Sequence, residues 1–170
     1  MGFWGSFVLA KTATAFAELS TVEQWELEVE GTSVMGDGWT VTQINGTTLA
    51  ENSDEVLTAL EGESGNPVLT GFVMDSDAVI VEARTPEGFL RLCLPRVYAV
   101  HEMPESLEMF ELAATAVPKL AAWAAAAGTL HDDDALRSLI DDDADSQEAF
   151  QGYAAFFALV SALGFAELPE

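Results

Sequence analysis

The stretch that decides the fold is residues 67–94, PVLTGFVMDSDAVIVEARTPEGFLRLCL. It contains three short runs of aliphatic, aromatic and β-branched residues, separated by two polar turns. In the second and third runs, side chains alternate between the two faces of an extended chain with a period of two, which is typical of strands. Small aliphatic side chains and leucines occupy one face, and a mixture of charged and apolar side chains occupies the other. The stretch therefore predicts a three-stranded antiparallel meander.

Burial and charge together predict the register of the last two strands. Pairing Arg84 with Phe89 sets Glu82 opposite Arg91, a cross-strand charge pair worth about 0.2 to 1 kcal/mol. A slip of one residue would place Glu82 and Arg84 among the leucines of the next strand. We therefore expect the register that pairs the two charges.

The same reasoning predicts the register of the first two strands. Pairing Met74 with Val79 leaves a four-residue turn and sets Phe72 beside Val81. We therefore expect a buried row made by Phe72, Val81 and Leu92. The opposite face, with Val73, Ile80, Phe89 and Cys93, is too apolar to face water, so we expect other elements to cover part of it.

Before the meander, short apolar segments separated by turn residues predict further strands and one inserted helix. The expected elements are a strand at 3–11, a helical turn leading into a strand at 20–30, a turn at 31–38, a strand at 39–45 and a helix at about 53–60.

After residue 104, alanine and leucine dominate, which favours helices. Apolar periodicity predicts helices at 105–127, 133–140 and 146–163, with Pro118 kinking or dividing the first. The last is apolar nearly all round. We expect it to pack within its own chain, and the alternative is a homo-oligomeric interface.

Strands followed by helices in a chain of this length predict one α+β domain over 1–170, with 1–100 mainly strands and 105–165 a helical layer. The expected architecture is an antiparallel sheet of about five or six strands, with one helix inserted before the meander. A C-terminal helical layer is expected to cover one face of the sheet.

The chain is strongly acidic, with 29 Asp and Glu against 6 Lys and Arg and a net charge of −23. Such a surface repels nucleic acid and anionic membranes, and it attracts cations or a basic protein. Hydrophobic residues make up 49% of the chain, which excludes a disordered acidic tail. The sequence therefore predicts a folded binding protein and no nucleic-acid or membrane partner.

The number of cysteines and the length of the longest apolar segment indicate the cellular compartment in which the chain is expected. Cys93 is the only cysteine, which excludes an intrachain disulfide and favours a reducing compartment. No apolar run reaches the roughly 20 residues that span a bilayer. We expect a cytoplasmic protein, and the alanine-rich, lysine-poor composition is typical of bacterial coding.

Catalytic and cofactor motifs are absent from the sequence: it has no phosphate-binding loop, no GxGxxG after a strand and no HExxH. The two histidines, His101 and His131, lie thirty residues apart, and neither has the partner and pocket that a general base needs. We therefore predict no catalytic residue and no cofactor. Cys93 is expected to serve in packing, because its surroundings are acidic.

The densest polar feature is HDDDALRSLIDDDAD, residues 131–145. Oxygen clusters of this kind bind hard cations, which makes it a weak candidate metal site. The candidate ligands are His131, Asp132, Asp134, Asp141, Asp143 and Asp145. The spacing departs from a calcium-binding loop, since Ser146 replaces the turn glycine and Gly152 the bidentate glutamate. Helix capping by the first three aspartates is the favoured interpretation.

Three tryptophans, Trp4, Trp25 and Trp39, crowd the first third of the chain. We expect them to build the core from strands. The alternative is a hydrophobic cleft or contact patch with an acidic rim, since large aromatics ringed by charge anchor many interfaces.

Two functional hypotheses follow from the sequence, beside a third possibility that the charge is merely adaptive, for solubility or a salty cytoplasm. The first is a non-enzymatic acidic binding protein, of an immunity or antitoxin-like type, whose carboxylates mask a basic partner. The residues expected to contact that partner are Glu26, Glu28, Glu30, Glu105, Glu108, Asp132, Asp133, Asp134, Asp141, Asp142 and Asp143. The second is a small-molecule or divalent-cation sensor, or a hydrolase, that uses the aspartate cluster near His131.

Overall fold

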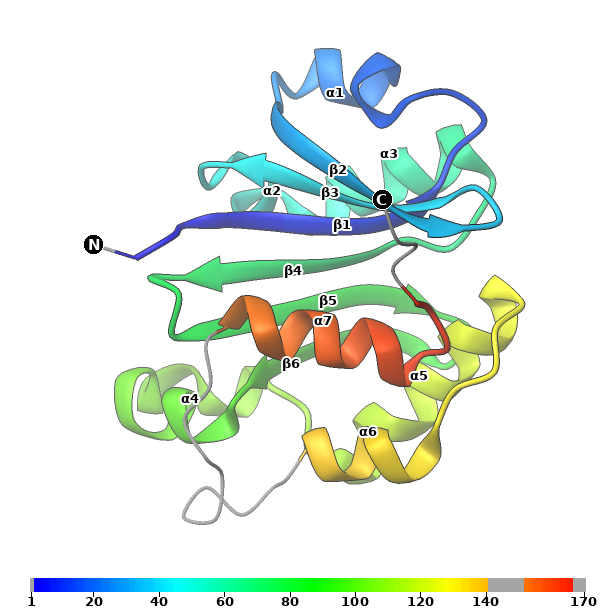
Figure 1. Cartoon of the computed structure of the whole chain (residues 1–170). Coiled ribbons are helices and arrows are strands. Elements are labelled where there is room, and N and C mark those ends of the chain that lie inside the picture. Colours follow the sequence, from blue (N-terminus) through cyan, green and yellow to red (C-terminus); the bar gives the residue numbers. More distant parts are fainter. Residues whose placement is uncertain (1, 141–151, 167–170) are drawn as a thin grey trace.

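A six-stranded antiparallel sheet forms the centre of the computed structural model, which describes residues 2–140 and 152–166 (Figure 1). The strands are β1 Gly5–Lys11, β2 Glu28–Gly36, β3 Trp39–Asn45, β4 Leu69–Met74, β5 Ala78–Thr85 and β6 Gly88–Leu94. Their order across the sheet is β2-β3-β1-β4-β5-β6. This confirms the predicted α+β class.

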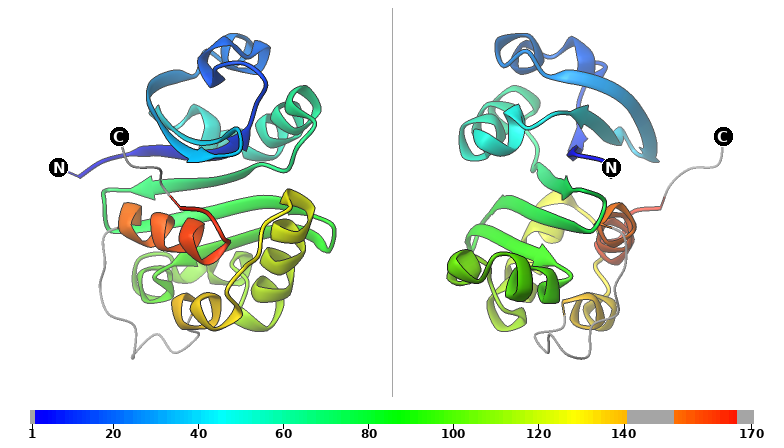
Figure 2. Two further views of the ribbon diagram at one scale, coloured as in Figure 1. Left: turned by 45° about the vertical axis from the view of Figure 1, so that its right-hand side comes forward. Right: turned by 90° about the vertical axis from the view of Figure 1, so that its left-hand side faces the viewer.

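Helices cover both faces of the sheet. They are η1 Phe16–Glu18, α1 Ser20–Gln24, α2 Thr48–Glu51, α3 Ser53–Ser64, α4 Arg96–Glu102, η2 Pro104–Met109, α5 Ala113–Ala127, α6 Asp133–Leu139 and α7 Gly152–Ala162, where η marks a 3-10 helix. In the right-hand view of Figure 2, α2, α3 and α4 lie on one side of the sheet, and α6 and α7 lie on the other.

The two faces differ in how they are covered. On the first face, α5, α6 and α7 share one continuous core with the sheet, including the fully buried Trp123 and Phe156. On the second face, α1 and α3 cover one part through the cluster around Leu57, while α4 and η2 cover another through the cluster around Cys93. The second face therefore carries two separate covering groups.

The β5–β6 hairpin has the predicted register. Arg84 pairs with Phe89 and Glu82 pairs with Arg91. The Thr85 hydroxyl donates to the carbonyl oxygen of Gly88 at 2.7 Å, which closes the turn.

The predicted register between β4 and β5 is wrong by one residue, since Met74 pairs with Ala78 rather than with Val79. The turn is shorter than expected because Asp75 and Ser76 adopt left-handed backbone angles, with φ of 49° and 64°. The Ser76 N–H donates to the Phe3 carbonyl, and the Ser76 carbonyl accepts from the Gly152 N–H. These tertiary contacts hold the turn.

As a result of that register, Gly71 occupies the place in the row beside Val81 that Phe72 was expected to fill, and Phe72 lies on the second face. A methyl group at Gly71 would lie 2.4 Å from a ring carbon of Phe156. The glycine therefore leaves the space into which α7 inserts Phe156.

The predicted helix at 105–127 is two helices, and Pro118 does not divide it. The break falls between η2 and α5, where Glu111 instead bonds to the backbone of β6. Pro118 lies inside α5 and costs that helix one backbone hydrogen bond.

Other boundaries also differ from the prediction. Residues 31–36 belong to β2 rather than to a turn, α3 runs through Gly62 to end at Gly65 with φ of 71°, and α2 and α4 were not predicted. The predicted helix at 146–163 is described only from Gly152, where it forms α7 and packs on β4, β5 and β6 of its own chain. Within the described ranges, no helix is both long and apolar enough to cross a membrane.

Gly71→Ala tests the contact between α7 and the sheet. We expect it to lower the free energy of unfolding by about 1 to 3 kcal/mol, because the methyl group overpacks against Phe156 and Val79. The control is Gly62→Ala on α3, where nothing lies within 4 Å and alanine is expected to stabilise by about 0.5 to 1 kcal/mol. Urea titration measures both, and equal effects would contradict this account.

Candidate functional site

The aspartates that begin α6 serve as a helix cap. The Asp132 carboxylate accepts a hydrogen bond from the backbone N–H of Ala135 at 3.0 Å. Asp133 pairs with Arg137 one turn later, at 2.6 Å. The capping interpretation therefore holds for this half of the cluster.

The structure gives the candidate metal site no support. His131 Nε2 lies 3.9 Å from Asp133, and Asp134 is exposed at the helix start. Over residues 2–140 and 152–166, no group of three or more His, Cys, Asp or Glu side chains is arranged to hold a metal ion. The other candidate ligands, Asp141, Asp143 and Asp145, lie outside the described residues, as does Asp142, which was predicted to contact a partner.

The remaining predicted contact residues lie on separate surfaces. Glu28 and Glu30 lie at the start of β2, one edge of the sheet, and Glu26 lies in the turn before it. Glu105 and Glu108 lie on η2, beside the opposite edge. The start of α6 belongs to the first face. The structure therefore does not bring these residues into one patch.

Most basic side chains are already paired with carboxylates. Arg84, Arg91, Lys119 and Arg137 each lie within 4 Å of a carboxylate oxygen, which accounts for four of the six basic residues. The charge left on the surface therefore comes largely from carboxylates.

Among these pairs, the most buried carboxylate is that of Glu82, which pairs with Arg91. Glu82 is 5% exposed, and its Oε2 accepts from Arg91 Nε at 3.1 Å, from Arg91 Nη2 at 2.9 Å and from the Ser53 hydroxyl at 2.9 Å. These bonds satisfy a charge that would otherwise be costly to bury. They also tie α3 to β5 and β6.

The outer edge of β6 is closed by two side chains. The Arg91 N–H donates to the Glu111 carboxylate at 3.1 Å, and the Glu111 N–H donates back to the Arg91 carbonyl at 2.9 Å. Lys119 donates to the Phe89 carbonyl at 2.7 Å and pairs with Glu111 at 2.7 Å. Glu111 thus takes the place of a neighbouring strand.

The outer edge of β2 is open by contrast. β2 pairs with β3 alone, and among the described residues nothing bonds to its outward backbone groups. Glu28 and Glu30 are exposed on this strand, and Val34 is 53% exposed. The strand also has irregularities between Val29 and Gly31 and between Val34 and Gly36.

A cleft of about 420 Å³ lies on the second face, between its two covering groups. Its residues come from four places: the chain before β1, the strands β4, β5 and β6, the α2 region, and the segment 103–110. They are Trp4, Thr47, Ala50, Glu51, Phe72, Ile80, Glu82, Arg91, Met103, Ser106, Met109 and Phe110. The predicted tryptophan core is thus divided, since Trp39 is buried and Trp4 is 48% exposed at this cleft.

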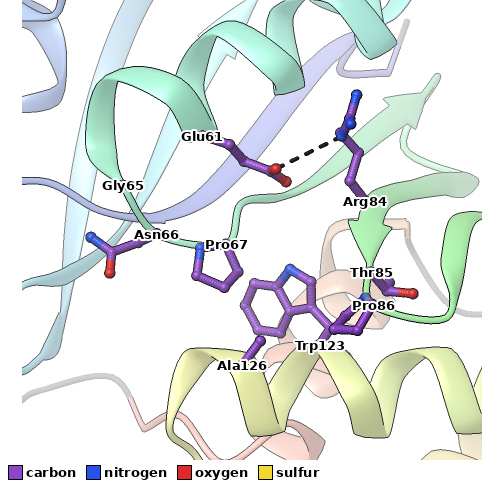
Figure 3. Close-up of a pocket in the computed structure, with 9 residues that line it drawn as sticks. All are labelled: Glu61, Gly65, Asn66, Pro67, Arg84, Thr85, Pro86, Trp123 and Ala126. Carbon is purple, nitrogen blue, oxygen red and sulfur yellow. Dashed lines mark ion pairs between the residues drawn. The ribbon is translucent and has the colours of Figure 1, made fainter.

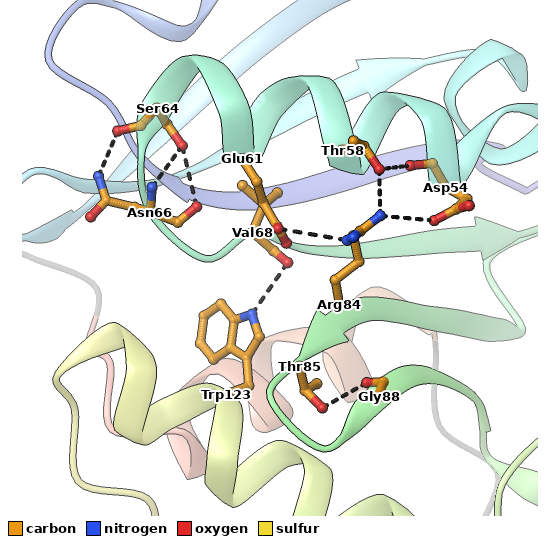
Figure 4. A network of polar contacts seen from close by, with 10 residues as sticks. All are labelled: Asp54, Thr58, Glu61, Ser64, Asn66, Val68, Arg84, Thr85, Gly88 and Trp123. Atoms are coloured by element: carbon orange, nitrogen blue, oxygen red, sulfur yellow. Dashed lines mark hydrogen bonds and ion pairs between the residues drawn. The ribbon is translucent and has the colours of Figure 1, made fainter.

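A second pocket, of about 430 Å³, lies beside the start of β4 and the end of β5 (Figure 3). Its charged groups hold the fold together. Arg84 donates to Thr58 at 2.6 Å and lies 3.5 Å from Asp54 and 3.8 Å from Glu61 (Figure 4). Thr58, Asp54 and Glu61 lie along one face of α3, so their contacts with Arg84 hold that helix against the sheet.

The same pocket contains a partly desolvated carboxyl group. Burial raises the pKa of Glu61, while the Arg84 charge and the Val68 backbone N–H offset part of the shift. Glu61 Oε1 is buried and has no hydrogen-bond partner within the described part of the chain. Trp123 also lines the pocket, but its indole N–H is engaged by the Val68 carbonyl at 3.2 Å.

Comparison of the chain with models of protein families, with curated proteins and with solved structures found no match. The sequence singled out the glutamates around β2, and it offered a hydrophobic cleft with an acidic rim near Trp4, Trp25 and Trp39 as the alternative to a tryptophan core. It did not indicate the other residues of the cleft, which lies where two covering groups do not meet.

Arg91→Met tests the buried pair. We expect a loss of about 2 to 3 kcal/mol in the free energy of unfolding, because Glu82 would keep a buried charge with one neutral partner. Arg137→Met removes an exposed pair and should cost less than about 0.5 kcal/mol. The Glu82→Leu/Arg91→Met double variant should recover part of the loss, and a loss equal to that of Arg137→Met would contradict the assignment.

Cys93 provides a test of burial on the second face. Desolvation raises the pKa of its thiol to about 12, so at pH 8 almost no reactive thiolate is present in the folded protein. We expect a disulfide reagent to label the folded chain only at the rate of unfolding, and the chain in guanidinium within seconds. Rapid labelling of the folded chain would show that α4 does not cover this thiol.

Proposed function

We propose that this chain is a non-enzymatic acidic binding protein that masks a basic protein partner at the β2 edge of its sheet. The observation that carries the proposal is the difference between the two edges. β6 is closed by Glu111 and Lys119, whereas the outward backbone groups of β2 have no partner among the described residues.

Backbone chemistry supports an extended partner segment. A free strand edge offers alternating N–H and C=O groups, and an extended peptide satisfies them by adding a strand. Each such hydrogen bond contributes modestly, so the affinity rests on several in a row. β2 is nine residues long, which accommodates several of them.

Charge supports a basic segment over other peptides. Glu28 and Glu30 are exposed at the start of β2, and Glu26 is exposed in the turn just before it. They repel a second copy of the same edge and attract lysine or arginine side chains of a partner. With a net charge of −23, the whole molecule also steers a basic protein toward itself.

Only some of the carboxylates predicted from the sequence lie where they could contact a partner at the β2 edge. Glu26, Glu28 and Glu30 would contact the partner, while Glu105 and Glu108 would act only through the overall field of the molecule. The lone cysteine favours a reducing, cytoplasmic setting for this binding. The alternative of a divalent-cation site gains no support from the described residues.

A peptide of alternating lysine and valine provides a probe for the β2 edge. Neutralising the edge by Glu26→Gln, Glu28→Gln and Glu30→Gln together should weaken its binding about tenfold, since three exposed pairs of about 0.5 kcal/mol are lost. The matched control replaces Glu102, Glu105 and Glu108 by Gln, which changes the net charge equally. We expect that control to weaken binding less than about twofold in fluorescence anisotropy.

A second arm separates strand addition from charge alone. The same peptide with N-methyl groups on alternate residues keeps every lysine but loses backbone donors, so its binding should also fall about tenfold. Equal weakening by both triple variants, together with no effect of methylation, would leave only diffuse charge attraction and overturn the proposal.

A further inference from the structure

The cleft on the second face gathers apolar side chains that the fold leaves open to water. Trp4 is 48% exposed and Met109 is 54% exposed, and Phe72 and Met103 beside them are half-buried. Apolar surface gathered in a concave site, with a few polar groups around it, is typical of a small-molecule pocket. The volume of about 420 Å³ lies in the range that such pockets have.

Two aromatic rings form one corner of the cleft. The Trp4 and Phe72 ring centroids are 6.0 Å apart, and the planes are tilted by 54°. Trp4 precedes β1, while Phe72 projects from β4, so the corner joins two separate parts of the chain. Tilted rings present both a ring face and a ring edge to the same space, and ring faces attract cations.

The charges around the cleft favour a cation over an anion. The guanidinium of Arg91 is bonded to Glu82 and lies 5.4 Å above the Phe89 ring, so the one positive group in the lining is already neutralised. Glu51 adds a carboxylate whose one hydrogen-bond donor within the described part of the chain is the Thr47 hydroxyl, at 3.1 Å. The described lining therefore carries one net negative charge.

We infer that this cleft binds a small organic cation, a tertiary or quaternary ammonium group on an apolar body. The apolar body occupies the space between Met103 and Met109, and the ammonium group lies against the Trp4–Phe72 corner near Glu51. An anion of the same size would meet two carboxylates and a guanidinium that is not free to bind it. The site shares no residue with the β2 edge, so it is independent of the function proposed above.

Benzyltrimethylammonium serves as the probe, and its trimethyl proton signal reports binding by NMR titration of the full chain. Benzyldimethylamine N-oxide is the comparison ligand, because it has nearly the same shape and no net charge. We expect the ammonium to bind saturably at one site and at least about fivefold more tightly than the N-oxide. Phenylmethanesulfonate should show no saturable binding.

Two variants locate the site. Trp4→Ala should abolish saturable binding, and Glu51→Gln should weaken it about threefold to tenfold. The matched control is Glu55→Gln, which removes an exposed carboxylate from the first turn of α3 outside the cleft lining and should change the affinity less than twofold. Thermal unfolding of Trp4→Ala confirms that the fold is retained.

Several outcomes would overturn the inference. Equal affinity for the N-oxide would show that the cleft does not recognise net positive charge. Equal weakening by Glu51→Gln and Glu55→Gln would show that the cation is attracted by the overall negative charge and not by the cleft. Unchanged binding by a folded Trp4→Ala variant would place the ligand elsewhere. None of these results bears on the β2 edge, whose probe is a peptide.

Discussion

The burial of Glu82 is the constraint on which much of this structure depends. A carboxylate that is 5% exposed requires charged and hydroxyl partners, and Arg91 and Ser53 supply them from two different elements. Arg91 in turn bonds through its backbone to Glu111, which pairs with Lys119. A continuous polar chain thus links α3, β5, β6 and α5 across the layers of the fold.

That polar chain explains why the helical half begins as it does. Glu111 can bond to the β6 backbone only from an extended segment, so the helix expected over 105–127 is interrupted there. The interruption places η2 at one wall of the apolar cleft and α5 over the opposite face of the sheet. One edge-capping contact therefore determines both the closed edge and the position of the cleft wall.

Local patterns of strand and helix residues in the sequence predicted the fold class. The β5–β6 register was predictable because only one alignment of the two strands sets Glu82 opposite Arg91 and keeps both charges away from the leucines. The β4–β5 register failed because the turn is held by contacts from Phe3 and Gly152, which are far away in sequence. A hydrophobic cleft was an alternative from the sequence, but its position and lining were not predictable for a similar reason, since it lies where two covering groups do not meet. Trp4 was grouped with Trp25 and Trp39, and the sequence could not decide which of the three lies in the core and which at a cleft.

The difference between the two sheet edges also limits stoichiometry. A sheet with two free edges can recruit a neighbour on each side, and repetition of that step produces a fibre. Within the described part of this chain, only β2 offers such an edge, because Glu111 and Lys119 occupy the other. Addition of neighbouring chains to this sheet would therefore stop after one chain has paired with β2. This favours a complex of two chains over an open-ended fibre.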